Sequence, residues 1–285
     1  MDTRERLCEE IARFVQQHPD NLREGGEGRY FGEPLVGFAA ADDPLFAAYQ
    51  TIIGAFHRTP GEWLAEAGGD PAPRAGTVVC WVLPITVEVR QSNRRQKEFP
   101  SRQWAHTRDF GEKFNRGLRA RVAEFLFEQG GRAVAPMLAA SWQRVVDPVV
   151  GLASTWSERH AAYAAGLGTF SLNDGLITPR GIAHRLGTVV TDLVLEPSPR
   201  PYADYRENCL TCRGEECGAC IPRCPAAAIT LAGHDKDRCQ QYTYETVLGT
   251  KGEEYGVSIT GCGLCQTGVP CESRIPTGTG GQRTR

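Results

Sequence analysis

The stretch that best indicates the fold of this chain is Cys217-Gly-Ala-Cys220-Ile-Pro-Arg-Cys224-Pro225. Of the 11 cysteines, all except Cys8 and Cys80 lie between Cys209 and Cys271. Two cysteines separated by two residues can place both thiolates on one metal cluster across a tight turn, and the cysteine before proline follows one helical turn later. The spacing therefore predicts ligation of iron by thiolates.

Bacterial ferredoxins use the same run, and in them the cysteine before proline ligates the second of two four-iron clusters. A downstream half is also present here, in Cys239, Cys262-Gly-Leu-Cys265 and Cys271. Upstream of Cys217 the usual gap of two residues is stretched to four, which gives Cys212, with Cys209 as a spare candidate. We assign one cluster to Cys212, Cys217, Cys220 and Cys271 and the other to Cys224, Cys239, Cys262 and Cys265.

Two other uses of the cysteines are weighed against iron. Paired CxxC units also build structural zinc sites, but zinc takes four ligands and gives no reason for a third cysteine followed by proline. Disulfides need an oxidising compartment, and the charged start of the chain lacks the apolar core of a signal peptide. Iron-sulfur ligation is favoured, and a cytoplasmic location is expected. Cys8 and Cys80 are expected to be small buried hydrophobes.

Length and composition predict two domains and a tail. The chain has 285 residues, which exceeds the usual size of one domain. The net charge of -2 gives no basic field that would attract nucleic acid or an anionic membrane, and no apolar run is long enough to predict a membrane span. We expect an α/β cofactor- and substrate-binding domain over 1–200, a ferredoxin-like domain with two 4Fe-4S clusters over 201–276, and a disordered tail over 277–285.

Hydrophobic periodicity predicts alternating helices and strands, which is typical of a layered α/β or α+β domain. A polar, arginine-rich stretch covers 90–108, and its part 101–108, which includes Trp104 and His106, is a candidate lid. The predicted helices are 3–17, 43–57, 109–129 and 157–165, and the predicted strands are 77–89, 132–137 and 187–195.

The segment from Ala165 to Gly181 reads AGLGTFSLNDGLITPRG, and HRLGTVVTDL follows from His184. This pattern resembles the cobalamin-dependent reductases, namely the epoxyqueuosine reductases and the reductive dehalogenases, in which it leads into a two-cluster ferredoxin module. The resemblance lies mainly over 158–242 and is faint over the first 150 residues. It implies an α+β fold with a nitroreductase-like cofactor-binding domain followed by a small ferredoxin-like domain.

The resemblance further implies bound cobalamin and a proton donor. It places seven residues at the cofactor, where glycines would let the backbone approach a flat macrocycle: Gly166, Gly168, Thr169, Asn173, Gly175, His184 and Arg185. The predicted catalytic residues are His160, Asp174 and Glu158, because a histidine, or a carboxyl group whose pKa is raised by burial, can donate a proton near neutral pH. The alternative is that the glycines only punctuate a helix-to-strand connection and that the polar groups are structural.

The chain departs from the epoxyqueuosine reductases at several positions. Their aspartate proton donor would fall near Leu152, which is not acidic. Leu172 occupies the position at which their glycine turn has a lysine. Five residues separate Cys265 from Cys271, and Pro270 precedes the last cysteine. Because the helical-repeat extension that helps those enzymes to hold tRNA is not found after the clusters, we do not expect tRNA as a partner.

The sequence therefore predicts an iron-sulfur oxidoreductase. Reduced ferredoxin or flavodoxin would load two 4Fe-4S clusters, which would pass electrons to a bound cobalamin that reduces a small electrophilic substrate. One alternative is an electron-transfer or cofactor-handling protein without turnover. Another is a flavin-dependent reductase on the same fold, with a phosphate site built from arginines such as Arg94, Arg95, Arg102 or Arg108.

Overall fold

The computed structural model describes residues 2–26, 28–68 and 74–278, so 279–285 of the predicted tail lie outside the described residues. The chain divides into two compact units. Two segments that precede residue 201 belong with the cysteine-rich region, and the predicted domain border at residue 201 stays a prediction. Unit 1 comprises Met1–Leu83, Phe110–Leu167 and Arg185–Pro201, and unit 2 comprises Pro84–Asp109, Gly168–His184 and Tyr202–Arg285.

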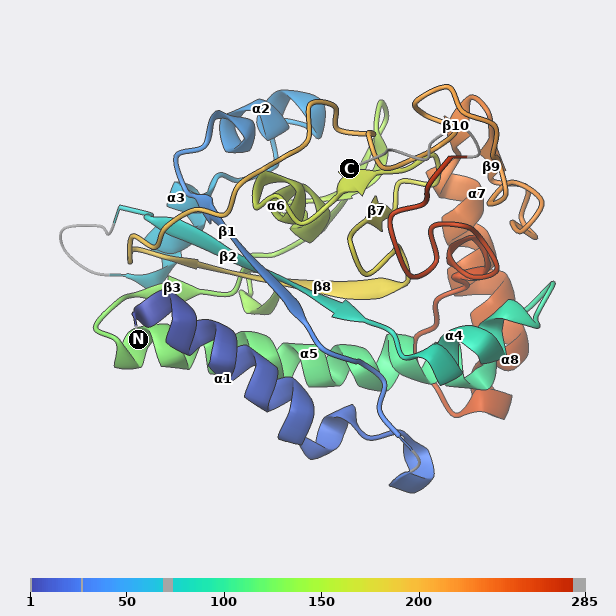
Figure 1. Cartoon of the computed structure of the whole chain (residues 1–285), viewed down its shortest axis with the longest axis horizontal. Coiled ribbons are helices and arrows are strands. Elements are labelled where there is room, and N and C mark those ends of the chain that lie inside the picture. The colour runs from blue at the N-terminus through green and yellow to red at the C-terminus, as the bar shows by residue number, and fades with distance from the viewer. Residues whose placement is uncertain (1, 27, 69–73, 279–285) are drawn as a thin grey trace. The chain divides into compact units, whose positions relative to one another are not determined.

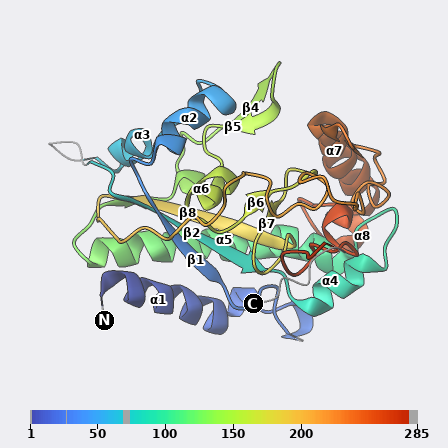
Figure 2. The ribbon, with the colours of Figure 1, turned by 45° about the horizontal axis from the view of Figure 1, so that its top comes forward.

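Unit 1 is built on a four-stranded sheet in the order β1-β2-β8-β3. Strand β1 (Leu35–Ala40) pairs antiparallel with β2 (Thr77–Pro84), and β3 (Ala133–Val134) pairs antiparallel with β8 (His184–Thr191). Every residue of β2 before Pro84 is buried, as the continuous apolar run predicts. Helices cover both faces of the sheet (Figures 1 and 2): α1 (Thr3–Gln17) and α5 (Arg102–Glu128) lie along one face, and α2 (Pro44–Ile52), α3 (Pro60–Leu64) and α6 (Glu158–Ala164) lie over the other.

Local sequence signals fix the helices of unit 1. Helix α1 (Thr3–Gln17) begins with a capping box between Asp2 and Glu5 and buries Leu7, Ile11 and Val15, which confirms the predicted helix. The other elements are α2 (Pro44–Ile52), α3 (Pro60–Leu64), α5 (Arg102–Glu128, shared with unit 2), α6 (Glu158–Ala164) and the hairpin of β4 (Arg144–Asp147) and β5 (Gly151–Ser154).

Aromatic rings fill the core of unit 1 on both faces of the sheet. Phe114 of α5 packs against Phe14 and Phe31, with ring centroids 5.4 and 5.8 Å apart. On the other face, Trp156 stacks on Phe46 and on His57. Large aromatic contacts of this kind make unit 1 a conventional hydrophobic domain.

Unit 2 contains little sheet, and its core is small. A cluster of Leu172, Ile177, Ile182, Cys209 and Ile229 forms this core, and several further cysteines pack against it. The elements are α4 (Val87–Arg94), the hairpins β6 (Thr169–Phe170) with β7 (Leu176–Ile177) and β9 (Ile229–Thr230) with β10 (Gly233–His234), and a helical run of α7 (Lys236–Gln241), a π-helical turn (Tyr242–Val247) and α8 (Leu248–Tyr255).

The structure confirms a mixed α+β fold but corrects several predicted elements. The predicted strand 77–89 ends at Pro84, because the chain turns at Thr86 into helix α4. The helix predicted from 109 starts at Arg102, since the Ser101 hydroxyl caps it by accepting from the amide of Trp104. The predicted strands 132–137 and 187–195 are β3 and β8, the first shorter and the second shifted toward the N-terminus.

Trp104 and His106 lie in helix α5 and are buried, with exposed fractions of 5% and 6%, so these two side chains do not form an exposed lid. In the described part of the chain, none of the helices combines the length and the apolarity that crossing a membrane requires.

Candidate functional site

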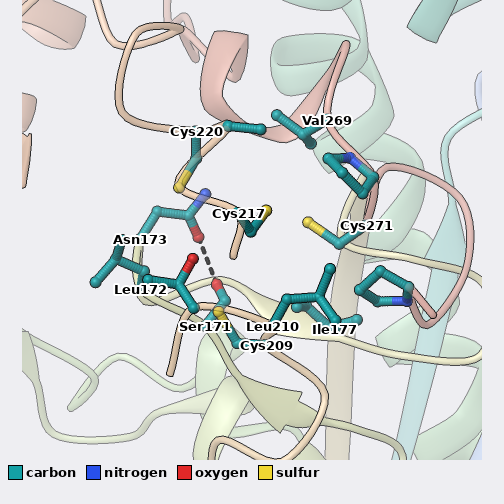
Figure 3. A pocket seen from close by; sticks show the side chains of 14 residues that line it. Ser171, Leu172, Asn173, Ile177, Cys209, Leu210, Cys217, Cys220, Val269 and Cys271 are labelled. Atoms are coloured by element: carbon teal, nitrogen blue, oxygen red, sulfur yellow. Dashed lines mark hydrogen bonds between the residues drawn. The ribbon is translucent and has the colours of Figure 1, made fainter. Parts of the chain in front are cut away.

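Four cysteines of unit 2 line one cavity, which holds about 350 Å³ of empty space and is partly open. Its other walls are mostly apolar and include Leu172, Ile177, Leu210 and Val269. Figure 3 shows the sulfur atoms of Cys217 and Cys271 facing each other across this space. Three of the four cysteines were assigned to one cluster from the sequence, but the fourth is Cys209, the spare candidate. The set is Cys209, Cys217, Cys220 and Cys271.

The turn between β6 and β7 forms one wall of this cavity. The side-chain oxygen of Asn173 accepts hydrogen bonds from the hydroxyl of Ser171 at 2.6 Å and from the amide of Gly175 at 3.0 Å. The Asn173 amide group in turn donates to the carbonyl of Cys265 at 3.1 Å. Asn173 thus ties the glycine turn to a cysteine loop, which is a structural role within unit 2.

The remaining four cysteines of this region also lie together. Burial, together with the neighbouring thiols of Cys239 and Cys224, raises the pKa of Cys262 to about 12. Burial also raises the pKa of Cys265, and its neighbours include the same three thiols. The sulfur of Cys224 accepts a hydrogen bond from the amide of Ala228 at 3.3 Å. The structure therefore brings together the four cysteines assigned to the second cluster, and their ligation stays a prediction.

The cysteines around the cavity also have raised pKa values. Burial, together with neighbouring thiols, raises the pKa of Cys271 to about 12 and that of Cys220 to about 11. Thiols with pKa values this high hold their protons at neutral pH, and ligation of a metal by them would release those protons. Among the described residues, no three His, Cys, Asp or Glu side chains converge on one point as ligands of a single ion do. Cysteines around a cubane stand further apart, because the cluster occupies the space between them.

A buried polar network holds the cysteine loops in place. The guanidinium of Arg223, between Cys220 and Cys224 in sequence, donates to the carbonyl oxygens of Leu264 at 3.1 Å and Thr267 at 3.0 Å. Its Nη1 also donates to the carbonyl of Gln96 at 2.7 Å. One side chain therefore ties the first cysteine loop to the second and to the segment after α4.

Glu272, which follows Cys271, anchors the other end of the second loop. It is 3% exposed and accepts from the Nε and Nη2 of Arg94 at 3.1 and 2.8 Å and from the amide of Gly268 at 2.7 Å. Asn93 donates to the hydroxyl of Thr267 at 3.1 Å. Arg94, a candidate for a flavin phosphate site, is instead bound to Glu272.

Glu158, a predicted proton donor, lies in unit 1 within a buried ion network. It accepts from Arg119 at 2.9 and 2.8 Å, and Arg119 also donates to Glu112 at 2.7 Å. Burial raises the pKa of Glu158, and the Arg119 charge opposes that shift. Arg119 is fully buried, and its positive charge is paired with the carboxylates of Glu158 and Glu112. The geometry gives Glu158 a structural task.

The other two predicted proton donors lie in different units. In unit 1, the Nδ1 of His160 is 2.7 Å from the Ser157 hydroxyl, and the His160 carbonyl accepts from Tyr49 at 2.9 Å. In unit 2, Asp174 has a positive φ of 58° and its carboxylate is 3.1 Å from the Nδ1 of His234. Burial lowers the pKa of His234, but hydrogen bonds to Asp174 and Cys239 outweigh it and raise the pKa to about 9. Asp174 is thereby connected to a cysteine of the second group.

The glycines that were predicted to contact the cofactor are closely packed against other parts of the chain. Gly166 has a φ of 73°, and a Cβ on it would lie 2.2 Å from the carbonyl oxygen of Pro199. A Cβ on Gly168 would lie 2.4 Å from the carbonyl oxygen of Ile177, and one on Gly175 would meet the side chain of Ile182 at 2.6 Å. These glycines are therefore required by packing inside their own units.

The polar residues that were predicted to contact the cofactor form hydrogen bonds or ion pairs inside their own units. The hydroxyl of Thr169 accepts from the amide of Asn208 at 2.8 Å, and the Nε2 of His184 is 2.8 Å from the carbonyl of Leu176. Arg185 donates to Glu112. Binding of cobalamin by the seven predicted positions stays a prediction.

Sequence reasoning missed the side chains that hold the cysteine loops. Arg223 and Glu272 are adjacent to predicted ligands, and that adjacency was a usable signal. Asn93 and His234 lie far from the cysteine motif or outside it, and no local pattern distinguishes them. They are found only when the fold brings their loops together.

Comparison with solved structures finds this fold in two groups of proteins. An epoxyqueuosine reductase with a modified tRNA stem loop aligns at a TM-score of 0.50 and 20% identity, over 95% of this chain and 66% of that one. The Bacillus subtilis epoxyqueuosine reductase gives 0.50 and 19%, over 97% and 68%. A reductive dehalogenase studied for B12-dependent dehalogenation gives 0.52 and 16%, over 85% and 30%. The chain is structurally similar to both groups, which confirms the predicted resemblance at the level of the fold.

The chain thus spans about two thirds of the length of the epoxyqueuosine reductases and 30% of that dehalogenase. No protein-family model matches the sequence, and the search of curated proteins gave no match.

Proposed function

We propose that the chain is an iron-sulfur oxidoreductase that carries electrons in two 4Fe-4S clusters bound by unit 2. The observation that supports this most directly is the grouping of the cysteines, four around one cavity and four beside it. Cys217, Cys220 and Cys271 would hold the first cluster with one of the thiols of Cys209 and Cys212. Cys224, Cys239, Cys262 and Cys265 would hold the second. The fold supports the same proposal, because it is the fold of cobalamin and iron-sulfur reductases.

The residues of unit 2 fit such clusters. The cavity wall is largely apolar, and the amide of Ala228 donates to the sulfur of Cys224, as hydrogen bonds to ligand sulfurs do where they tune cluster potentials. The thiol of Cys220 is among the neighbours that raise the pKa of Cys265, so the two groups adjoin, as electron transfer between two clusters would require. Reduced ferredoxin or flavodoxin is the proposed donor, and unit 2 is the proposed ferredoxin-like part of the protein.

Cobalamin, bound in a nitroreductase-like part, is the proposed acceptor, and this part of the proposal depends on the resemblance alone. Bound cobalamin would supply a low-valent metal for reduction of a small electrophilic substrate, with tRNA not proposed as a partner. The residues placed at that cofactor are engaged inside their own units, so we derive no catalytic step from them.

A second candidate function is electron transfer without turnover. The ion network of Arg119 favours it, since Glu158 is one of the three predicted proton donors and already balances a buried charge. A flavin-dependent reductase on this fold is a further alternative, but Arg94, one of its predicted phosphate ligands, is bound to Glu272.

Anaerobic purification with iron analysis and electron paramagnetic resonance (EPR) spectroscopy tests the proposal. We expect about eight irons per chain, the number in two four-iron clusters, and EPR signals from two reduced clusters. Titration with cobalamin then separates the proposed functions. A change in the EPR signal of cobalt on binding supports the cobalamin-dependent reductase. An eight-iron protein that does not bind cobalamin supports electron transfer without turnover or the flavin-dependent reductase. Less than about one iron per chain after anaerobic reconstitution would rule out all iron-sulfur forms.

A further inference from the structure

The first cluster has one ligand too many in the sequence. Cys209 and Cys212 both precede Cys217, and spacing alone favours Cys212 as the nearer thiol. Only one of them is needed, because Cys217, Cys220 and Cys271 supply three of four ligands. The structure separates the two candidates by position, burial and contacts.

We propose that Cys209 is the fourth ligand of the first cluster and that Cys212 remains a thiol that donates a hydrogen bond to it. This inference rests on the proposed iron-sulfur function and assigns a ligand within it. Cys209 lines the cavity together with the other three cysteines, whereas Cys212 is not among the described residues that line it (Figure 3). The electrostatic neighbours of Cys271 are likewise Cys220, Cys209 and Cys217.

The backbone holds Cys209 in this position. Its amide donates to the carbonyl of Arg206 at 2.9 Å, and its carbonyl accepts from the amide of Arg213 at 3.1 Å. The residue is 8% exposed and belongs to the apolar core with Leu172 and Ile177. A ligand at the floor of an apolar cavity keeps water away from the cluster, which is one of the properties that set a cluster's potential.

Cys212 has the position of a supporting group. It is partly exposed and packs against the same core from outside the cavity. Cys209 belongs to the apolar cluster against which Cys212 packs, and a thiol S–H can donate a hydrogen bond to a neighbouring thiolate sulfur. Ligation of iron by Cys209 would release the proton of that thiol to solvent, and Cys212 would keep its own. A donated hydrogen bond to a ligand sulfur stabilises the reduced, more negative cluster.

Iron content and EPR spectra of matched serine variants test the assignment. Cys217→Ser serves as the control that removes an undisputed ligand, and Cys8→Ser serves as the control for a cysteine of unit 1. We expect Cys209→Ser to lose one cluster, and with it about half of the iron, as Cys217→Ser does. Cys212→Ser is expected to keep the wild-type iron content and both cluster signals, as Cys8→Ser does.

Retention of both clusters by Cys209→Ser, or loss of one by Cys212→Ser, would overturn the assignment. If Cys209→Ser does not fold, Cys212→Ser decides alone by whether it keeps the wild-type EPR signals. A wild-type protein without iron would instead contradict the proposed function, so the two failures are distinguishable.

The hydrogen bond has its own test. Cys212→Ala should lower the midpoint potential of one cluster, and Cys212→Ser should shift it less. An unchanged potential in both variants would show that Cys212 does not donate a hydrogen bond to the ligand.

Discussion

Units 1 and 2 are stabilised in different ways. Unit 1 surrounds a four-stranded sheet with helices and fills its core with aromatic and branched side chains. Unit 2 has two-residue strands, a small core and loops that side chains such as Arg223 and Glu272 hold through hydrogen bonds. Apart from Cys239 in α7, the cysteines assigned to the two clusters lie in loops and short turns, whose backbone can direct several thiols toward a common centre. Unit 1 is therefore expected to fold through burial, and unit 2 through polar contacts and the clusters that we propose.

Removal of iron is expected to have the largest effect and to act on unit 2. Metal-binding free energy becomes folding free energy where the site does not exist in the unfolded chain. After treatment with a chelator under reducing conditions, hydrogen exchange should become fast across 209–224 and 262–272 and stay slow in strands β2 and β8. Reconstitution with iron and sulfide is the control and should restore protection. Equal loss of protection in both units would show that the clusters stabilise the whole chain.

Loss of Arg119 should have the next largest effect and should act on unit 1. Arg119→Met leaves the carboxylates of Glu158 and Glu112 without their shared partner, and breaking a buried ion pair costs about 3–5 kcal/mol. Urea unfolding followed by tryptophan fluorescence measures the free energy of unfolding. Arg116→Met, an exposed position on the same helix, is the matched control and should unfold as the wild type does. A loss below 1 kcal/mol would mean that this network contributes little.

Acid should also weaken unit 1 through His57. Burial lowers the pKa of His57 from 6.5 to about 4. The unfolded chain therefore takes up this proton at higher pH than the folded chain, and the folded state loses stability as the pH falls from 6.5 to 4. At one side chain the loss reaches about 3 kcal/mol. Unfolding free energies of wild type and His57→Gln across this range check it: the variant should show a smaller slope, and identical slopes would exclude His57 as the cause.

The smallest effect is expected from one hydrogen-bonded residue of unit 2. Asn93 is fully buried, donates to Thr267 and accepts from the amide of Ser101 at 2.9 Å. Asn93→Ala should cost about 1–3 kcal/mol, because it leaves buried groups without partners. Hydrogen exchange of the 262–272 loop in the iron-loaded protein measures the change. Arg95→Ala, at an exposed neighbour, is the control, and equal exchange in the two variants would show that Asn93 does not hold the loop.

The sequence predicted unit 1 better than unit 2 for a physical reason. Helix α1 and strand β2 bury faces that repeat with a regular period, so the residues themselves report which side is buried. Prediction failed where a local signal ended a strand, as at Pro84, or began a helix, as at Ser101, and in unit 2, where two-residue strands are too short to show a period. The predicted proton donors were chosen by residue type, and residue type does not show that Glu158 pairs with Arg119.

The sequence by itself determined that this chain has cysteines at iron-sulfur spacing, a mixed α+β fold and a resemblance to cobalamin-dependent reductases, because each depends on short-range order along the chain. Only the tertiary structure decided which thiols share a cavity, which glycines are needed for packing and which charges are neutralised. Those properties depend on segments that lie far apart in the sequence, such as Cys209 and Cys271 or Arg94 and Glu272. The spacing of cysteines in the sequence predicts candidate ligands, but the positions of their thiols, which distinguish one candidate from another, exist only in the folded chain.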